Sequence, residues 1–112
     1  MKKSSYVFSM EVAPLARREL LSAGEKHTVT RMYLGAGKKD KPHSHPHEQT
    51  CYILAGEGTF ALGGERTTLK AGDFVYVEGG TEHGFVEIRE DVVMLECFAP
   101  VREDIVAAHL IK

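Results

Sequence analysis

The sequence predicts an all-β domain, a small closed barrel or sandwich, followed by one short C-terminal helix. Two observations lead to this prediction. Eleven glycines divide the chain. The short stretches between them are rich in β-branched and aromatic residues and alternate in polarity, a pattern that is typical of small β domains. At 112 residues the chain can form one domain with a core but not two. We therefore expect a single domain over residues 1–112.

Eight segments have the composition and alternation of strands, and short connections between them favour a barrel or sandwich. They are 17–22, 27–34, 49–55, 58–63, 65–70, 73–78, 83–88 and 92–98. The first also fits an amphipathic helix, but Gly24 ends it too early and a strand follows at once, so we prefer a strand. Glycines at 24, 63 and 72 fall where hairpin turns need positive φ.

The last eleven residues, "REDIVAAHLIK", have helical rather than strand spacing. Ile105, Ala108 and the pair Leu110–Ile111 are expected on one side of this helix, and Asp104 lies near its N-terminal end, where a negative charge is favourable. The sequence therefore predicts a helix that packs one apolar side against the β domain.

Composition excludes two classes of partner. The balance of 14 basic against 16 acidic side chains, with a sequence pI near 6.3, provides no basic face for nucleic acid. The apolar run near the N-terminus is too short for an export signal, and no run approaches the roughly 18 apolar residues of a membrane helix. We expect a soluble cytoplasmic protein, in which Cys51 and Cys97 are thiols because they fit neither a CxxC motif nor a disulfide framework.

Histidines gather in "KPHSHPHEQ", residues 41–49. On an extended strand His43 and His45 share a face, so both imidazoles can reach one metal ion. A Gln or Glu a few residues on, here Gln49, and a distant His83 after a glycine turn would complete the site. A lone histidine is more often a surface or hydrogen-bonded core residue, and His47 has that alternative because Pro46 disturbs the strand. His27 and His109 are interpreted in that way.

These residues carry a family resemblance. Residues 37–56 resemble the first cupin motif, in which a glycine and five residues precede HxH, a third ligand and a second glycine. Residues 72–87 resemble the second motif, which ends in the histidine at 83. The resemblance implies a double-stranded β-helix, a small jelly-roll barrel. It also implies one divalent transition metal ion (Ni, Zn, Fe or Mn) on four residues, His43, His45, Gln49 and His83.

The sequence departs from the usual cupin pattern at three positions. Most cupins have glutamate as the third ligand, where this chain has Gln49. Glu78 and Glu87 stand where the second motif usually has proline and asparagine. A neutral amide leaves the ion its full formal charge, which suits polarising a carbonyl or hydroxyl and suits redox cycling less.

The ending "MLECFAPVREDIV", together with "HPHEQ", is similar to a narrower group, the small KdgF-type cupins of pectin and alginate breakdown. That resemblance implies conversion of a 4,5-unsaturated uronate to its open-chain keto form. It makes Glu96 the catalytic acid or base, Arg102 a catalytic residue that binds the substrate carboxylate, and Phe98 a substrate contact. Arg18 is expected to help bind the substrate, and Arg31 is a less certain helper.

Alternatives stay open for each of these residues and for the function. Glu96 could form a structural ion pair with Arg18 or Arg31, Phe98 could be a core aromatic, and Arg102 a solvated surface residue. Rival functions are a metal-dependent dioxygenase of a small organic acid and a small-ligand-binding or sensor cupin without activity. The partners expected are a small sugar acid and a second copy in a homodimer, with "YVFSM" (6–10) and "HTVTRMYL" (27–34) as exposed edges.

Overall fold

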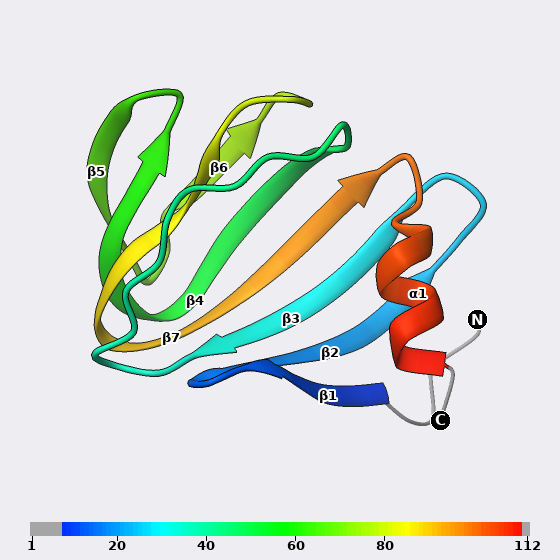
Figure 1. The fold of residues 1–112 in the computed structure, drawn as a ribbon, viewed down its shortest axis with the longest axis horizontal. Helices are drawn as coiled ribbons and strands as arrows, with labels where there is room; N and C mark the ends of the chain where they lie inside the picture. The colour runs from blue at the N-terminus through cyan, green and yellow to red at the C-terminus, as the bar shows by residue number, and fades with distance from the viewer. Residues whose placement is uncertain (1–7, 111–112) are drawn as a thin grey trace.

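The computed structural model describes residues 8–110, which form seven strands and one helix (Figure 1). The prediction of an all-β fold with a short C-terminal helix is confirmed. The elements are β1 (Phe8–Ala13), β2 (Ala16–Ala23), β3 (Thr28–Leu34), β4 (Glu48–Leu62), β5 (Glu65–Lys70), β6 (Phe74–Val77), β7 (His83–Ala99) and α1 (Glu103–Leu110).

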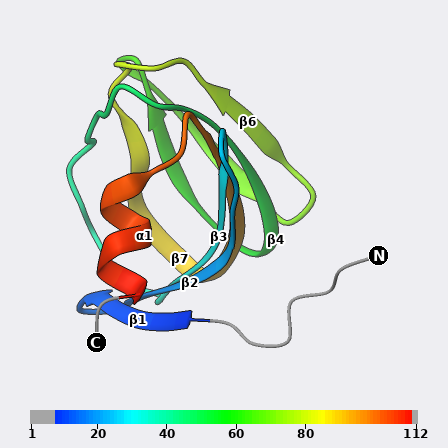
Figure 2. The ribbon, with the colours of Figure 1, turned by 90° about the vertical axis from the view of Figure 1, so that its right-hand side faces the viewer.

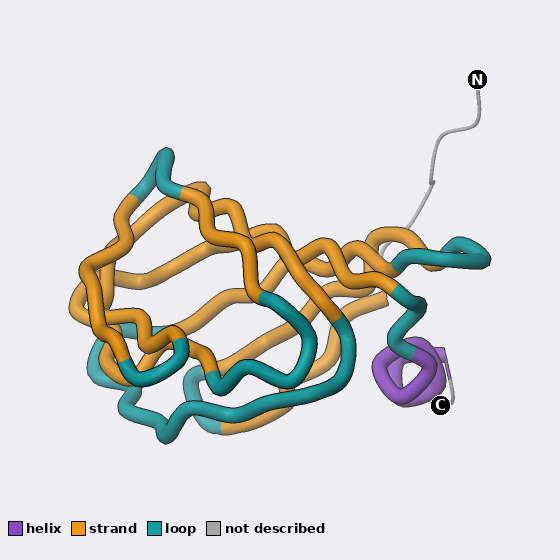
Figure 3. Tube along the Cα trace, turned by 90° about the horizontal axis from the view of Figure 1, so that it is seen from above, coloured by secondary structure: helices purple, strands orange, loops and turns teal. Residues whose placement is uncertain are grey.

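All strand pairs are antiparallel, in the order β1-β2-β3-β7-β4-β5, and β6 pairs with β4 beside β5. The strands curl around an interior, with α1 at one end (Figure 3). One of the two expected edges was wrong. Segment 27–34 forms β3, which lies between β2 and β7 and is therefore no exposed edge. Residues 6–7 of the other expected edge lie outside the described residues, and 8–10 belong to β1 at one end of the strand order.

Two pairs of predicted strands each form one long bent strand, so the eight predicted strands become six, and β1, which was not predicted, is the seventh. Segments 49–55 and 58–63 form β4, and segments 83–88 and 92–98 form β7, with register shifts where the two strands pair near Gly56. A Cβ on Gly56 would lie 2.0 Å from the carbonyl oxygen of Asp91, and its φ is +86°. Glycine therefore lets β4 and β7 bend together while their backbone hydrogen bonding continues on both sides of the bend.

One face of the curled sheet forms the core. Buried side chains alternate with exposed neighbours over the first half of β4, as a half-buried antiparallel sheet requires. Phe60 and Phe85 meet edge to face, with ring centroids 5.2 Å apart. The cluster around them comprises Ala16, Leu34, Cys51, Ile53, Leu69, Val77, Ile88, Val92 and Met94. This core fixes the wall of the barrel that carries the histidines.

The three glycines predicted at hairpin turns differ in backbone conformation. Gly63 and Gly72 have φ of 58° and 94°, as predicted, but Gly24 does not lie in the positive-φ region. A Cβ on Gly24 would lie 2.8 Å from the His27 ring, so glycine at that position makes room for a close side chain rather than for a left-handed turn.

Helix α1 begins at Glu103 and lies beside β1 and β2 (Figure 2). Ile105 packs with Leu20 and Phe98, so the predicted apolar side is confirmed at that residue. Ala108 was expected on the same side but is exposed, and His109 is buried instead. The His109 ring faces two carbonyl oxygens, with Nδ1 2.9 Å from that of Ile105 and Nε2 3.3 Å from that of Arg18.

Within residues 8–110, α1 falls well short of the length that would cross a membrane, and no other helix is present there. The side chain of Leu110 and the whole of Ile111 lie outside the described residues. The predicted cytoplasmic location stays a prediction.

Candidate metal centre

Two distant segments meet where the loop of residues 35–47 crosses β7. His43 and His83 exchange both backbone hydrogen bonds, at 2.9 and 2.8 Å, and their ring centroids lie 4.6 Å apart. Gly84 makes this approach possible, because a Cβ on it would lie 3.1 Å from Cε1 of His43. The backbone therefore places the loop histidine directly beside the first residue of β7.

The three histidines converge as the sequence predicts. One ring nitrogen from each of His43, His45 and His83 lies within 4.8 Å of the others, so these three could hold a metal ion. Gln49, the second residue of β4, joins them: its Oε1 is 2.6 Å from Nε2 of His45 and 3.0 Å from Nε2 of His83. The structure thus brings the four predicted metal ligands into one cluster.

The donor set of this cluster fits a divalent transition metal ion. Nδ1 of His83 lies 2.8 Å from the carbonyl oxygen of Thr81. Its proton is therefore on Nδ1, which leaves the Nε2 lone pair free. That lone pair faces the amide oxygen of Gln49, another acceptor, at 3.0 Å. Two acceptors at this separation resemble neighbouring ligands on one ion, since two bonds of about 2.1 Å at right angles span about 3 Å.

Partial burial favours the neutral form of the loop imidazoles. It lowers the pKa of His43 to about 4, with the neighbouring rings of His83 and His45 adding to the effect. Burial also lowers the pKa of His45, as does the positive charge of Arg102. Neutral imidazoles have the lone pairs that metal binding requires.

A layer of hydrogen bonds behind Gln49 fixes its amide. Nε2 of Gln49 donates to Sγ of Cys51 at 3.0 Å and to Oε2 of Glu96 at 3.4 Å, which turns Oε1 toward the imidazoles. Oε1 of Glu96 accepts a hydrogen bond from the Thr30 hydroxyl at 3.1 Å. Burial raises the pKa of the Glu96 carboxyl, while the charge of Arg18 and the Thr30 hydrogen bond oppose the rise.

Phe98 connects this cluster to Arg102. The Phe98 ring is 5.8 Å from that of His45, centroid to centroid, and the guanidinium carbon of Arg102 lies over the Phe98 ring, 4.8 Å from its centroid. Nε and Nη2 of Arg102 donate to the Asp104 carboxylate at 3.0 and 2.9 Å. The guanidinium has five N–H donors, and those on Nη1 take no part in the ion pair with Asp104. Phe98 is 3% exposed and also packs in the core under α1.

The other two arginines differ in position. Arg18 is half-buried, and its Nε is buried without a hydrogen-bond partner in the described part of the chain. Burial lowers the pKa of Arg18, and the charge of Glu96 opposes this shift. Arg31 was weighed as a helper, and the structure places it elsewhere: Nε of Arg31 lies 2.6 Å from Glu19, on the opposite face of β3 from Thr30. Among the described residues Glu96 has no ion pair within 4.0 Å, so the structural ion-pair alternative is not found.

His47 lies next to the cluster rather than in it. Its ring centroid is 5.6 Å from that of His45, and its buried Nδ1 has no partner among residues 8–110. Sequence reasoning missed Thr30, Thr81 and Asp104. The even spacing of Thr28 and Thr30 was a usable signal for inward-facing side chains. Their partners could only be assigned once the strand register was known: Thr30 donates to Glu96, and the Thr28 hydroxyl accepts from the backbone amide of Arg102 at 2.9 Å.

The comparisons with known proteins agree with this geometry. The Cupin domain model matches residues 30–98, which is more than half of the chain. The chain belongs to the cupin family. It is 28% identical over 89 residues to the pectin degradation protein KdgF of Dickeya dadantii, covering 79% of this chain and 81% of that protein. It is also 33% identical over 77 residues to an uncharacterised protein of Streptomyces coelicolor, covering 68% and 73%.

Solved structures show the same cupin fold. KdgF from a Halomonas species superposes with a TM-score of 0.81 at 26% identity, covering 87% of this cupin and 89% of that chain. An RmlC-like cupin from Shewanella frigidimarina has a TM-score of 0.84 at 23% identity, covering 93% of each chain. The predicted resemblance to KdgF-type cupins is confirmed, and this cupin has a histidine triad that could bind a metal ion.

Proposed function

We propose that this cupin is a metal-dependent enzyme that acts on a small sugar acid and converts a 4,5-unsaturated uronate to its open-chain keto form. One observation carries the proposal: the convergent histidines and Gln49 lie directly against a buried carboxylate, Glu96, which contacts the Gln49 amide at 3.4 Å. The relation to two proteins named KdgF, one of them described as a pectin degradation protein, supports the substrate class.

His43, His45 and His83, with the Oε1 atom of Gln49, would hold the ion. When bound, a divalent ion would act as a Lewis acid that stabilises negative charge on substrate oxygens. All four donors are neutral, so they leave the charge of the ion undiminished. Zn, Ni, Fe and Mn all accept imidazole with an amide oxygen.

The reaction is an isomerisation in which atoms balance within the substrate. The bond between carbon 1 and the ring oxygen breaks, the hydroxyl on carbon 1 loses its proton to become an aldehyde, carbon 4 gains a proton, and carbon 5 becomes a ketone. A group that both accepts and returns a proton is needed. Glu96 fits that role because the residue is 8% exposed and burial raises the pKa of its carboxyl.

Arginine side chains provide the recognition of the substrate carboxylate in this proposal. Arg102 presents its Nη1 edge while Asp104 holds the other edge, and a planar guanidinium matches the geometry of a carboxylate. Phe98 supplies an apolar surface between Arg102 and the histidines. Arg18 has an unpartnered buried Nε in the described part of the chain and serves as a second donor.

The test follows loss of the ultraviolet absorbance of a lyase-generated 4,5-unsaturated uronate monomer, with and without a chelator. We expect chelator-sensitive acceleration over the spontaneous reaction. His45→Ala should lose metal and activity together, whereas Glu96→Gln should keep the metal and lose activity. No acceleration by the metal-loaded protein would overturn the proposed reaction. Oxygen uptake would then test the dioxygenase alternative, and ligand binding without turnover would test the sensor alternative. Full turnover by Glu96→Gln would overturn the proton-transfer role of that residue.

A further inference from the structure

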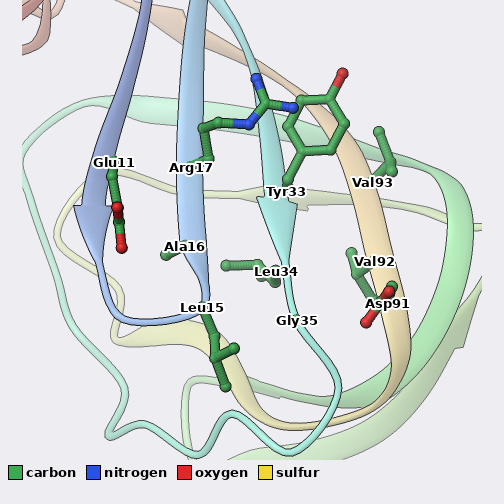
Figure 4. Close-up of a pocket in the computed structure, with 10 residues that line it drawn as sticks. All are labelled: Glu11, Leu15, Ala16, Arg17, Tyr33, Leu34, Gly35, Asp91, Val92 and Val93. Atoms are coloured by element: carbon green, nitrogen blue, oxygen red, sulfur yellow. The ribbon is translucent and has the colours of Figure 1, made fainter.

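Strand β3 presents two buried threonines to the interior of the barrel. Thr28 and Thr30 are each 0% exposed. The odd-numbered residues of β3 face outward: the Tyr33 ring lies under the guanidinium of Arg17, whose carbon is 3.9 Å from the ring centroid, beside a pocket of about 540 Å³ (Figure 4). Because successive side chains of a strand point to opposite faces, both threonines point to the side of the sheet that carries the metal cluster.

The two threonines contact different parts of the site. Thr30 donates to the Glu96 carboxylate at 3.1 Å, whereas the Thr28 hydroxyl accepts from the backbone amide of Arg102 at 2.9 Å. Thr28 is also paired with Phe98 in the ladder of β3 and β7. Paired residues of an antiparallel ladder lie on the same face, so the ring over which Arg102 lies is the direct neighbour of Thr28. Strand β3 is therefore hydrogen-bonded both to the proposed proton-transfer residue and to the proposed carboxylate-binding residue.

Arg102 is held at both its backbone and its side chain. Its amide donates to Thr28, and its carbonyl oxygen accepts from the amide of Val106 at 3.0 Å, in the first turn of α1. Its guanidinium lies over the Phe98 ring and donates to the Asp104 carboxylate. The side chain of Arg102 is 13% exposed. An arginine that is anchored in this way has less side-chain freedom to lose when it binds a ligand.

The contact with Thr28 differs from the others because it ties the backbone of Arg102 to the sheet. Asp104 and Val106 belong to α1, which begins directly after Arg102, so their contacts would move together with that residue. Phe98 belongs to the sheet but contacts the guanidinium, at the flexible end of the side chain. The Thr28 hydrogen bond acts where the side chain begins. It therefore sets where Arg102 lies relative to the strands that carry the metal cluster.

We propose that Thr28 is a positioning residue for substrate binding, which holds Arg102 at a fixed place relative to the histidines so that one sugar acid can reach both. This inference rests on the function proposed above, in which Arg102 binds the substrate carboxylate. Thr28 itself contacts no substrate. The carboxylate keeps its charge throughout the isomerisation, so its contact with Arg102 contributes about equally to binding of the substrate and of the transition state. Loss of the Thr28 hydroxyl should therefore raise KM and leave kcat nearly unchanged.

The test is steady-state kinetics of the full chain, loaded with Zn²⁺, on the lyase-generated uronate monomer. Thr28→Val keeps the shape of the side chain without the hydroxyl and should raise KM at least about tenfold, with kcat within about threefold of the wild type. Thr28→Ser keeps the hydroxyl and should restore KM. Thr30→Val removes the contact with Glu96, so it should lower kcat and leave KM within about threefold. Val29→Thr, the reverse exchange on the outward side of β3, is the control and should change neither constant.

A second measurement needs no substrate. The Nε–H group of Arg102, which donates to Asp104, is followed in the nitrogen-15 NMR spectrum and assigned by its absence in Arg102→Lys. We expect its resonance to be kept in Thr28→Ser and Thr30→Val and to shift or broaden in Thr28→Val.

Far-UV circular dichroism must show that each variant is folded, and Thr28→Ala replaces Thr28→Val if the valine variant is not. An unchanged KM or an unchanged Arg102 resonance in the folded variant would overturn the positioning role, as would a rise in KM that Thr28→Ser shares. Absence of turnover by the wild type would instead overturn the proposed function, and the resonance would still decide whether Thr28 holds Arg102.

Discussion

Gly79 lies against the loop that carries the histidines, and replacing it with alanine should weaken metal binding. A Cβ on Gly79 would lie 2.3 Å from the carbonyl oxygen of Pro46. An ordinary contact is longer by about 1 Å, so the loop must move by roughly that distance. His45 precedes Pro46 and would be displaced with it. Changes to groups that orient metal ligands typically cost 10–100-fold in affinity, and we expect Gly79→Ala to fall in that range.

The neighbouring glycine gives a matched control. Gly80 has φ of +83° but open space around a Cβ, and its amide donates to the carbonyl oxygen of His45 at 2.8 Å. Gly80→Ala should therefore cost about 1 kcal/mol of stability through backbone strain while leaving metal affinity nearly unchanged. Calorimetric titration of both variants and the wild type with Zn²⁺ measures the difference. Zinc affinity of folded Gly79→Ala within about threefold of wild type would refute the reasoning.

Three further predictions concern stability. Thr30→Val removes the hydroxyl that donates to the buried Glu96 carboxylate. It should lower the free energy of unfolding, measured with urea, by about 2 kcal/mol. Thr30→Ser keeps a hydroxyl and should lose less stability, so equal losses in the two variants would contradict the hydrogen-bond explanation. Hydrogen bonds from Arg102 lower the pKa of Asp104 to about 2, below its unfolded value of about 3.9. Its stabilisation is therefore present above about pH 4 and lost as pH falls toward 2. The wild type should exceed Asp104→Asn by up to about 1 kcal/mol at pH 6, because the carboxylate is largely exposed, and the difference should vanish near pH 2; a pH-independent difference would disprove the linkage. Gly56→Ala would drive a Cβ into the backbone of β7 and should cost about 3 kcal/mol, so a melting temperature equal to wild type would contradict the contact.

The strand content and the metal cluster could be predicted because their signals are local in the sequence. Alternation and glycine spacing mark the strands, and the HxH pair with a distant histidine marks the candidate ligands. The merging of strands could not be foreseen in that way. Gly56 has the same appearance in the sequence as a turn glycine such as Gly63, and only the register of β4 against β7 shows that one bends a strand and the other ends it.

Side-chain partners across the barrel were less predictable than positions along a strand. Arg18 and Arg31 were both candidates in the sequence, because each lies in a predicted strand. Pairing decides between them: Thr30 lies opposite Glu96, so Arg31, one residue on, must face outward and meets Glu19. The choice depends on a one-residue difference in register, and no local pattern specifies register between strands so distant in the chain.

The position of His43 beside His83 has a thermodynamic consequence. A metal ion held jointly by the loop before β4 and the first residue of β7 connects segments that are far apart in the unfolded chain, so it acts as a reversible cross-link. Binding free energy that is available only to the closed barrel is added to folding stability and grows with the logarithm of free metal concentration. A bound metal ion would therefore also stabilise the fold, and chelation should lower the stability of the barrel as well as the proposed activity.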